Sequence, residues 1–381
     1  MAIDLGSDSM KIAVVLPKVP MEVALDGRAQ RKTPVAVGFR DGERLFGADA
    51  INVASMRPAY VYQSISSIIG KHIDHPTVQL YRQRYPYHNL TYDELTGQLI
   101  FHHPEGMSFT VEELLAMLLE YARDIAESHS EATIKTCVLT VPSFYGLNER
   151  ESLIRAVRIA GLELQQLINV NTAVALDFGI SRRKSFNESS QFFMFFDVGY
   201  TSTTATVVSY HVGKHHQGGV SAQDPILTIL GVGSAPNLGT SSLIYRIRDY
   251  FAESFSESTA IPLSIVRENA RVMSRISREA VRVLNVLSAN TEADAQIEQL
   301  LNEKDFRLHI TREQMETLCK MEFDAFAKPF SDALTGSGVD LSVIQDIVLM
   351  GGGTRIPKVQ EILMSLGKRY GSFASCYFMC F

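Results

Sequence analysis

A short pattern occurs twice in the sequence and restricts the possible folds more than any other feature. Each copy is a strand-like apolar segment that ends in Asp-x-Gly and turns into a second strand-like segment. The first copy is Ile3-Asp4-Leu5-Gly6, and the second is Phe196-Asp197-Val198-Gly199. Self-similarity over a domain-sized interval indicates an internal duplication. We therefore expect two related halves.

The remaining hydrophobic pattern predicts strands and helices in both halves. In the first half, strands are expected at 11–16, 21–25, 33–39, 136–141 and 167–170, and helices at 48–55, 111–128, 149–160 and 172–178. The stretch 72–103 is rich in Tyr and His and is expected to be loop-like. In the second half, strands are expected at 192–196, 203–210 and 344–350, with a helix from Ile356 and mixed helical material from about 238 to 330.

The Asp-x-Gly turns suit phosphate and a hydrated metal ion. Glycine permits a tight turn, and backbone N–H groups in such a turn can point at phosphate oxygens. The acid cannot bind phosphate directly, but it suits a water of hydrated Mg²⁺. One such turn also occurs in ordinary hairpins, so only the pair is informative. The candidate residues are Asp4, Gly6, Ser7 and Asp8 in the first hairpin and Asp197, Gly199, Tyr200 and Thr201 in the second, with Asp4 and Asp197 as the acids that hold Mg²⁺ through waters.

A third motif, Gly351-Gly352-Gly353-Thr354-Arg355, follows a predicted strand. Glycines at this point let the backbone approach a flat ligand closely. Arg355 can either stack on a purine face or reach phosphate. We therefore add Gly351, Gly352 and Arg355 to the candidate nucleotide-binding residues.

Together with Thr140-Val141-Pro142 and Ile159-Ala160-Gly161-Leu162, these motifs resemble the nucleotide-binding domain of the heat-shock seventy chaperones, in the actin-like ATPase superfamily. The resemblance runs from Ile3 to about Leu363. It implies an α/β fold with two lobes around a nucleotide cleft. Lobe I would be 1–183 with an inserted subdomain at about 40–108, and lobe II 184–381 with an insertion at about 238–310. The tail, 365–381, departs from the family pattern.

Within this family the chain is most similar to a large endoplasmic-reticulum member. The segments that carry this similarity are 31–35, 166–169, 286–290 and 296–298. The resemblance implies ATP or ADP and Mg²⁺ as cofactors, Ser288 as a purine contact, and a stress-response chaperone in the endoplasmic-reticulum lumen. It further implies nucleotide exchange on the lumenal seventy-kilodalton chaperone, with unfolded clients bound by a half that is absent here. Two N-glycosylation sequons, at Asn89 and Asn187, fit that compartment.

Several positions depart from the family pattern. Ser66 stands where hydrolysing members have a lysine, Val170 where they have a glutamate, and Thr204 where they have a second aspartate. Lys71 lies beyond the turn and is expected to point elsewhere. At the purine, Leu284 and Asn285 replace a Lys-Arg pair, so either binding is weaker or Leu284 packs there. Phosphoryl transfer depends on positioning and charge stabilisation, so weak or absent ATPase activity is expected.

Composition limits the other classes of function. The chain carries 36 basic and 42 acidic residues, a net charge of −6, so no nucleic-acid partner is expected. No apolar run approaches the ~18–20 residues that span a bilayer. Two alternatives stay open: a catalytically dead scaffold, and a small-molecule kinase of the same superfamily. The kinase is disfavoured because no acidic base aimed at a substrate hydroxyl was found.

Overall fold

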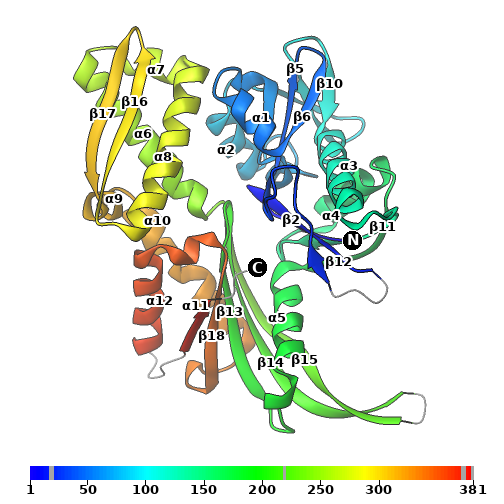
Figure 1. Ribbon diagram of the computed structural model, residues 1–381. Helices are drawn as coiled ribbons and strands as arrows, with labels where there is room; N and C mark the ends of the chain where they lie inside the picture. The colour runs from blue at the N-terminus through cyan, green and yellow to red at the C-terminus, as the bar shows by residue number, and fades with distance from the viewer. Residues whose placement is uncertain (17–20, 218–219, 370–374, 379–381) are drawn as a thin grey trace. The chain divides into compact units, whose positions relative to one another are not determined.

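The computed structural model describes residues 1–16, 21–217, 220–369 and 375–378 (Figure 1). The chain forms two compact units. Unit 1 comprises Met1–Ile168, Ile247–Val283 and Asp294–His309, and unit 2 comprises Asn169–Arg246, Leu284–Ala293 and Ile310–Phe381. The predicted lobe boundary after residue 183 and the two predicted insertions stay predictions.

Unit 1 is organised around a mixed sheet with the strand order β12-β11-β1-β2-β3, and β4 pairs with β2 as well. Strand β1 runs parallel to β11 and antiparallel to β2. The strands of this sheet are β1 (Ala2–Leu5), β2 (Ser9–Val14), β3 (Glu22–Val23), β4 (Thr33–Pro34), β11 (Thr136–Val141) and β12 (Glu163–Asn169).

Unit 2 is organised around a five-stranded sheet with the order β15-β14-β13-β18-β19. Strand β13 runs antiparallel to β14 and parallel to β18. The strands are β13 (Gln191–Val198), β14 (Ser202–Gln217), β15 (Val220–Pro236), β18 (Ile344–Met350) and β19 (Ser375–Phe378).

The two sheets confirm the predicted duplication. Both place a hairpin beside a parallel strand and follow the same order of strands. The register also repeats. Asp4 pairs with Lys11 and Asp197 with Thr204, so each aspartate pairs with the residue seven positions further on.

Helices cover these sheets because each carries an apolar stripe and a defined end. Helix α3 (Val111–Ser130) begins in a capping box, in which Glu113 N–H donates to Thr110 Oγ1 and Thr110 N–H donates to Glu113 Oε2. Helix α4 (Leu147–Ile159) ends before Gly161, whose φ of +68° is the left-handed conformation expected after a helix. The other helices beside the sheets are α5 (Val170–Ser181), α11 (Ala327–Ser337) and α12 (Pro357–Arg369).

The prediction of a loop at 72–103 is wrong. This stretch forms helix α2 (Pro76–Arg84) and the hairpin of β8 (Asn89–Asp93) and β9 (Gln98–His102), and β9 also pairs with β10 (Ser108–Thr110). The reason is burial: Tyr81 is 3% exposed and Phe101 is fully buried. Large aromatic side chains that pack on one another stabilise a regular hairpin here, although the polar residues between them hide the alternation.

The remaining elements include two smaller sheets and several helices. Strands β5 (Ala36–Arg40), β6 (Glu43–Phe46) and β7 (Val61–Gln63) form one sheet, beside α1 (Gly47–Ala54). Strands β16 (Glu292–Leu301) and β17 (Lys304–Thr311) form the other. The remaining helices are α6 (Thr240–Thr259), α7 (Leu263–Glu268), α8 (Ala270–Ala289), α9 (Arg312–Leu318) and α10 (Lys320–Ala325).

Two sequence expectations concern the tail and the membrane. Within the tail, α12 continues to Arg369 and β19 is formed, and residues 370–374 and 379–381 lie outside the described residues. Over the part of the chain that is described, no helix combines the length and apolar character needed to cross a bilayer.

Candidate nucleotide-binding site

The first Asp-x-Gly hairpin, in unit 1, is held by hydrogen bonds at both sides of its turn. Gly6 N–H donates to Ser9 O at 3.2 Å. A Cβ on Gly6 would lie 2.6 Å from the same oxygen, so glycine is required by close approach. Thr140 Oγ1 donates to Asp4 Oδ1 at 2.9 Å and accepts from Leu5 N–H at 3.1 Å. One oxygen of Asp4 is thereby fixed at the end of β1, and Thr140 of the neighbouring strand positions it.

The other two candidates of this hairpin lie in its turn. Asp8 is exposed, and its carboxylate lies 3.5 Å from Lys32 Nζ in a surface ion pair. The backbone carbonyl of Asp8 accepts from Val35 N–H at 2.8 Å. Ser7 is half-buried beside it. Exposed ion pairs contribute little free energy, so the backbone bonds are what holds the turn.

The second hairpin, in unit 2, repeats this arrangement. Gly199 N–H donates to Ser202 O at 2.9 Å, with the same spacing as in the first hairpin. The carbonyls of Gly199 and Tyr200 accept from Thr240 N–H at 3.0 Å and from Ser241 N–H at 2.8 Å. These N–H groups begin α6, where a helix leaves its first donors unpaired. The turn that contains Tyr200 and Thr201 is therefore fixed against the start of α6.

The glycine-rich turn after β18 packs directly on the second hairpin. Gly351 has a φ of +74°, and a Cβ there would lie 2.3 Å from Asp197 Oδ1. A Cβ on Gly353 would lie 2.4 Å from Val198 Cγ1. Gly352 is different, since nothing lies within 4 Å of its Cβ position. Two of the three glycines therefore serve internal packing, and Gly352 is the one that faces open space.

Arg355 and Ser288 were expected to contact a purine. Arg355 is exposed at the end of the 3₁₀ turn Gly352–Arg355. Ser288 lies on α8, and its hydroxyl donates to Asn285 O at 2.7 Å, so only its lone pairs are open to a ligand. Leu284 is 4% exposed, and its side chain lies in the core of the protein. Whether Leu284 also packs against a bound purine stays a prediction.

In unit 1, the position where hydrolysing members have a lysine is occupied by a buried, hydrogen-bonded serine. Ser66 is 5% exposed, its hydroxyl donates to Gly6 O at 3.3 Å, and its carbonyl accepts from Tyr145 OH at 2.6 Å. Lys71 points elsewhere, as expected: its Nζ lies 2.6 Å from Glu149 Oε1. Burial by itself would raise the pKa of Glu149, but the hydrogen bond and charge of Lys71 outweigh it, so the pKa of this carboxyl lies below its ordinary value. Lys71 is thus held in an ion pair away from the hairpin.

In unit 2, a neutral network occupies the position of the missing second aspartate. Thr204 Oγ1 donates to Asn171 Oδ1 at 3.2 Å, and Asn171 Nδ2 donates to Thr206 Oγ1 at 2.9 Å. All three side chains are buried. Val170 is the first residue of α5, immediately before Asn171. Because these groups satisfy one another and none is charged, they offer no carboxylate to the waters of a metal ion.

The chain's own residues fit phosphate better than they fit a directly bound metal. The described residues contain no group of three or more His, Cys, Asp or Glu side chains that could hold an ion. Each hairpin supplies one aspartate at a strand end, with backbone N–H groups in the adjoining turn. Mg²⁺ keeps several waters and needs few protein ligands. Each aspartate, taken within its own unit, has the chemistry to accept a hydrogen bond from a water of a hydrated ion, and their joint role in one site stays a prediction.

Two sheets of the same strand order, each with an Asp-x-Gly hairpin, define an actin-like ATPase fold. The profile of the Hsp70 protein family matches residues 1–372, and the chain belongs to this family.

Individual relatives agree with this assignment. The chain is 44% identical over 369 residues to hypoxia up-regulated protein 1 of Danio rerio. The aligned region covers 97% of this chain and 37% of that protein. It is 40% identical over 366 residues to the Xenopus laevis protein of that name, covering 96% of this chain and 56% of the relative. Identity to the Homo sapiens protein is 41% over 370 residues, 97% of this chain and 37% of the relative. The chain thus spans between about a third and just over half of the length of these relatives.

Proposed function

We propose that this chain is the ATP-binding domain of a stress-response chaperone, and that it binds Mg·ATP but hydrolyses it very slowly. The family supports the chaperone role and the nucleotide. The observation that best supports slow hydrolysis is the neutral hydrogen-bond network of Asn171, Thr204 and Thr206. This network lies where a hydrolysing member has a carboxylate. Ser66, closed onto Gly6, adds a second lost group.

Bound Mg·ATP would be held by the residues of the family's nucleotide site that this chain retains. Backbone N–H groups of the turns at Gly6 and Gly199 would donate hydrogen bonds to phosphate oxygens, and Asp4 and Asp197 would accept hydrogen bonds from the waters of Mg²⁺. Gly352 borders open space, which permits a ligand to approach the backbone. Mg²⁺ supplies neutralisation of the phosphate charge when it is bound.

Slow turnover follows from the number of groups that are lost. One missing group in a preorganised site typically costs ~10²–10³ in rate. Groups that act together are not additive, so the losses at Ser66, Val170 and Thr204 cannot be multiplied. Long-lived ATP would then act as a structural ligand that stabilises the folded domain.

The partners and the compartment rest on the relatives. We propose that the full protein resides in the endoplasmic-reticulum lumen, acts as a nucleotide exchange factor for the lumenal seventy-kilodalton chaperone, and binds unfolded clients through a part outside this chain. The relatives' name, hypoxia up-regulated protein, supports a stress response. Asn187 is exposed, and its Oδ1 accepts from Ser189 N–H at 2.8 Å, so its sequon lies on the surface.

Thermal unfolding tests nucleotide binding. A ligand that binds only the folded state raises the melting temperature by mass action, so we expect Mg·ATP to raise it in the parent. Asp197→Ala should abolish the rise, while Asp324→Ala, an exposed aspartate of α10, should preserve it. Circular dichroism establishes that both variants fold. No rise in the parent at saturating Mg·ATP contradicts the proposal.

Glycan analysis tests the compartment. The full-length protein, purified from its native cells, should carry a glycan that endoglycosidase removes. Asn187→Gln should eliminate more of this modification than Asn89→Gln, because Asn89 begins strand β8 and Asn187 lies in an irregular segment outside the helices and strands. A native product that stays cytosolic and is unaffected by endoglycosidase would exclude the lumen.

A further inference from the structure

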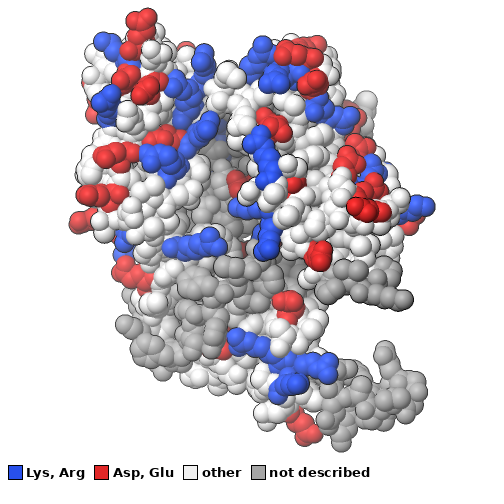
Figure 2. Space-filling model, in the orientation of Figure 1, with Lys and Arg blue, Asp and Glu red and all other residues white. Residues whose placement is uncertain are grey.

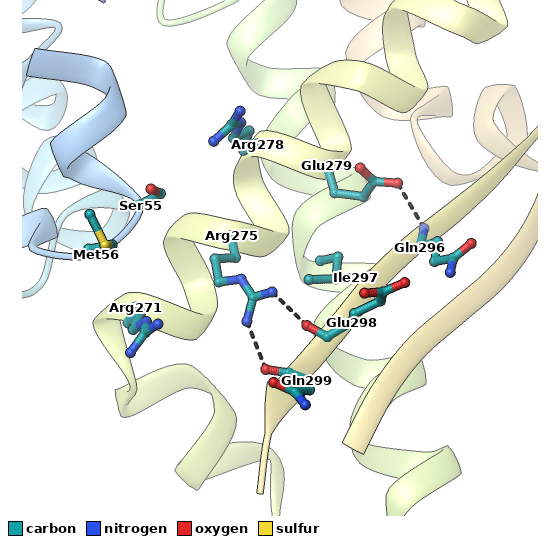
Figure 3. A pocket seen from close by; sticks show the side chains of 10 residues that line it. All are labelled: Ser55, Met56, Arg271, Arg275, Arg278, Glu279, Gln296, Ile297, Glu298 and Gln299. Atoms are coloured by element: carbon teal, nitrogen blue, oxygen red, sulfur yellow. Dashed lines mark hydrogen bonds between the residues drawn. The ribbon is translucent and has the colours of Figure 1, made fainter. Parts of the chain in front are cut away.

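A polar pocket lies within unit 1, and none of its lining residues belongs to either Asp-x-Gly hairpin. It is lined by the first half of α8, by strand β16 and by the residues that follow α1 (Figure 3). Its volume is about 410 Å³, inside the range of ~300–1,000 Å³ that is common for small-molecule sites. Nothing in the nucleotide site uses these residues.

Three arginines of α8 give the pocket its chemistry. Arg271, Arg275 and Arg278 all line it. Positions i, i+4 and i+7 of a helix share one side, and at ~1.5 Å per residue the outer two are ~10 Å apart along the axis. Figure 2 shows basic side chains over the region that α8 occupies in Figure 1.

Arg275 is held in place without being neutralised. Its guanidinium donates to Glu298 O at 2.6 Å and to Gln299 O at 2.8 Å (Figure 3). Both acceptors are backbone carbonyls, so the positive charge has no counter-ion in these bonds. The central arginine of the three is therefore fixed by strand β16 and still carries its charge.

The acidic residues of the pocket do not cancel the three charges. Glu279 is already paired with Arg282 at 2.6 Å, and it also accepts from Gln296 N–H at 2.9 Å. Glu298 is exposed at the rim. Over the described ranges, neither Arg271 nor Arg278 has a hydrogen-bonding or ion-pair partner in the protein. The pocket thus holds an excess of positive charge.

We propose that this pocket is a binding site for a small anion that carries several phosphate groups. The planar fork of arginine matches phosphate and binds it in a bidentate way. Two unpaired arginines ~10 Å apart along the helix, with a third fixed between them, suit a ligand with more than one phosphate. An extended acidic peptide is a poorer fit, because Arg275 and Glu279 already bond the outer edge of β16, and a peptide strand would need that edge.

Calorimetric titration with inositol hexakisphosphate, in buffer containing a chelator and no Mg²⁺, tests the proposal. We expect saturable binding with one site per chain. The double variant Arg271→Gln/Arg278→Gln should weaken it at least about tenfold, a loss of about 1.4 kcal/mol. Both side chains are exposed, so the variant should melt like the parent. The control, Arg40→Gln/Arg158→Gln, removes two exposed arginines elsewhere in unit 1 and should bind normally.

Four outcomes would overturn the proposal, three of them from the titrations already described and one from a further variant. The first is no saturable binding, and the second is an equal loss in both double variants, which would mean non-specific attraction. The third is tighter binding of a poly-glutamate peptide than of the phosphate probe, which would mean an acidic peptide site. Asp197→Ala separates the two sites: the phosphate probe should bind this variant normally, and loss of binding would place the probe at the nucleotide hairpin instead.

Discussion

At the residue scale, adjacent glycines of one turn have different roles. Gly351→Ala puts a Cβ 2.3 Å from Asp197 Oδ1 at a φ of +74°, and the neighbouring backbone cannot yield. We expect the free energy of unfolding to fall by ~2 kcal/mol or more and the rise in melting temperature with Mg·ATP to disappear.

The matched control is Gly352→Ala, one position along. Nothing lies within 4 Å of its Cβ position, so stability should stay within ~0.5 kcal/mol of the parent. Because this residue faces open space, nucleotide affinity should fall even though stability is kept. Equal destabilisation by both substitutions, measured by chemical denaturation, would contradict the packing described for Gly351.

His88 predicts a loss of stability in acid. Burial lowers the pKa of His88 to about 4 from 6.5. The ring lies between Tyr81 OH at 3.2 Å and Val61 O at 3.1 Å, which fits the neutral form. The unfolded chain takes up the proton near pH 6.5 and the folded chain only near pH 4, so stability present above pH 6.5 is lost as the pH falls between these values.

Denaturation at about pH 7.5 and about pH 5 measures this effect, which should be ~2 kcal/mol. His88→Gln should lower stability at both values but show a smaller difference between them. The control His72→Gln, which replaces a partly exposed histidine, should keep the full difference. An unchanged pH dependence in His88→Gln would rule out His88 as its source.

The positions of the two aspartates on their strands were predictable, but the hydrogen-bond partners of buried polar residues were not. Asp4 and Asp197 end strands in the sequence and in the structure, because the hairpin pattern is local. The neutral bond of Thr204 to Asn171 joins residues 33 positions apart in the chain. The sequence shows that an aspartate is missing at Thr204, but it does not show that buried neutral groups satisfy one another there.

At the element scale, helix α3 offers a test of local stability. Thr110 and Glu113 satisfy two backbone N–H groups at its start. Thr110→Ala should lower the free energy of unfolding by ~1 kcal/mol. Thr133→Ala, an exposed threonine after the helix, is the control and should have little effect. Equal unfolding curves for the two variants would mean that packing alone stabilises this helix.

Elements with a local signal were predicted, and elements that depend on distant contacts were not. Helix α3 was expected at 111–128 and is observed at Val111–Ser130, because its cap and apolar stripe lie within one segment. Strands β8 and β9 were missed, since Tyr81 and Phe101 stabilise that hairpin from positions 20 apart. Closure of the β16 edge by Arg275 is equally invisible without the fold, although an exposed edge strand requires some such cover.

At the scale of the whole molecule, two tetrapeptides predicted the internal duplication, and the resemblance of the full set of motifs to the Hsp70 family implied the α/β fold. The prediction succeeded because each Asp-x-Gly turn requires a specific register, and that register places the aspartate beside a parallel strand. The strand order is then repeated in each sheet, down to the fifth strands, β12 and β19. The bounds of the lobes had no comparable local signal.

The last prediction concerns turnover. We expect single-turnover hydrolysis by the purified domain to take hours, because Ser66 and Thr204 close the positions of two lost groups with neutral side chains. Ser66→Lys/Val170→Glu/Thr204→Asp should raise the rate at least about 100-fold. Val170→Glu alone is the variant that should fold most readily, since an acid at the first position of α5 is favoured by the helix dipole. Turnover within minutes in the parent would contradict the inactive-site interpretation.

ADP release from a partner chaperone provides the second measurement. If slow turnover serves exchange, the parent domain with ATP should accelerate that release as well as the restored variant does, because holding ATP and not cleaving it would be the functional state. An ATP-bound domain that leaves the release unchanged would instead support a scaffold.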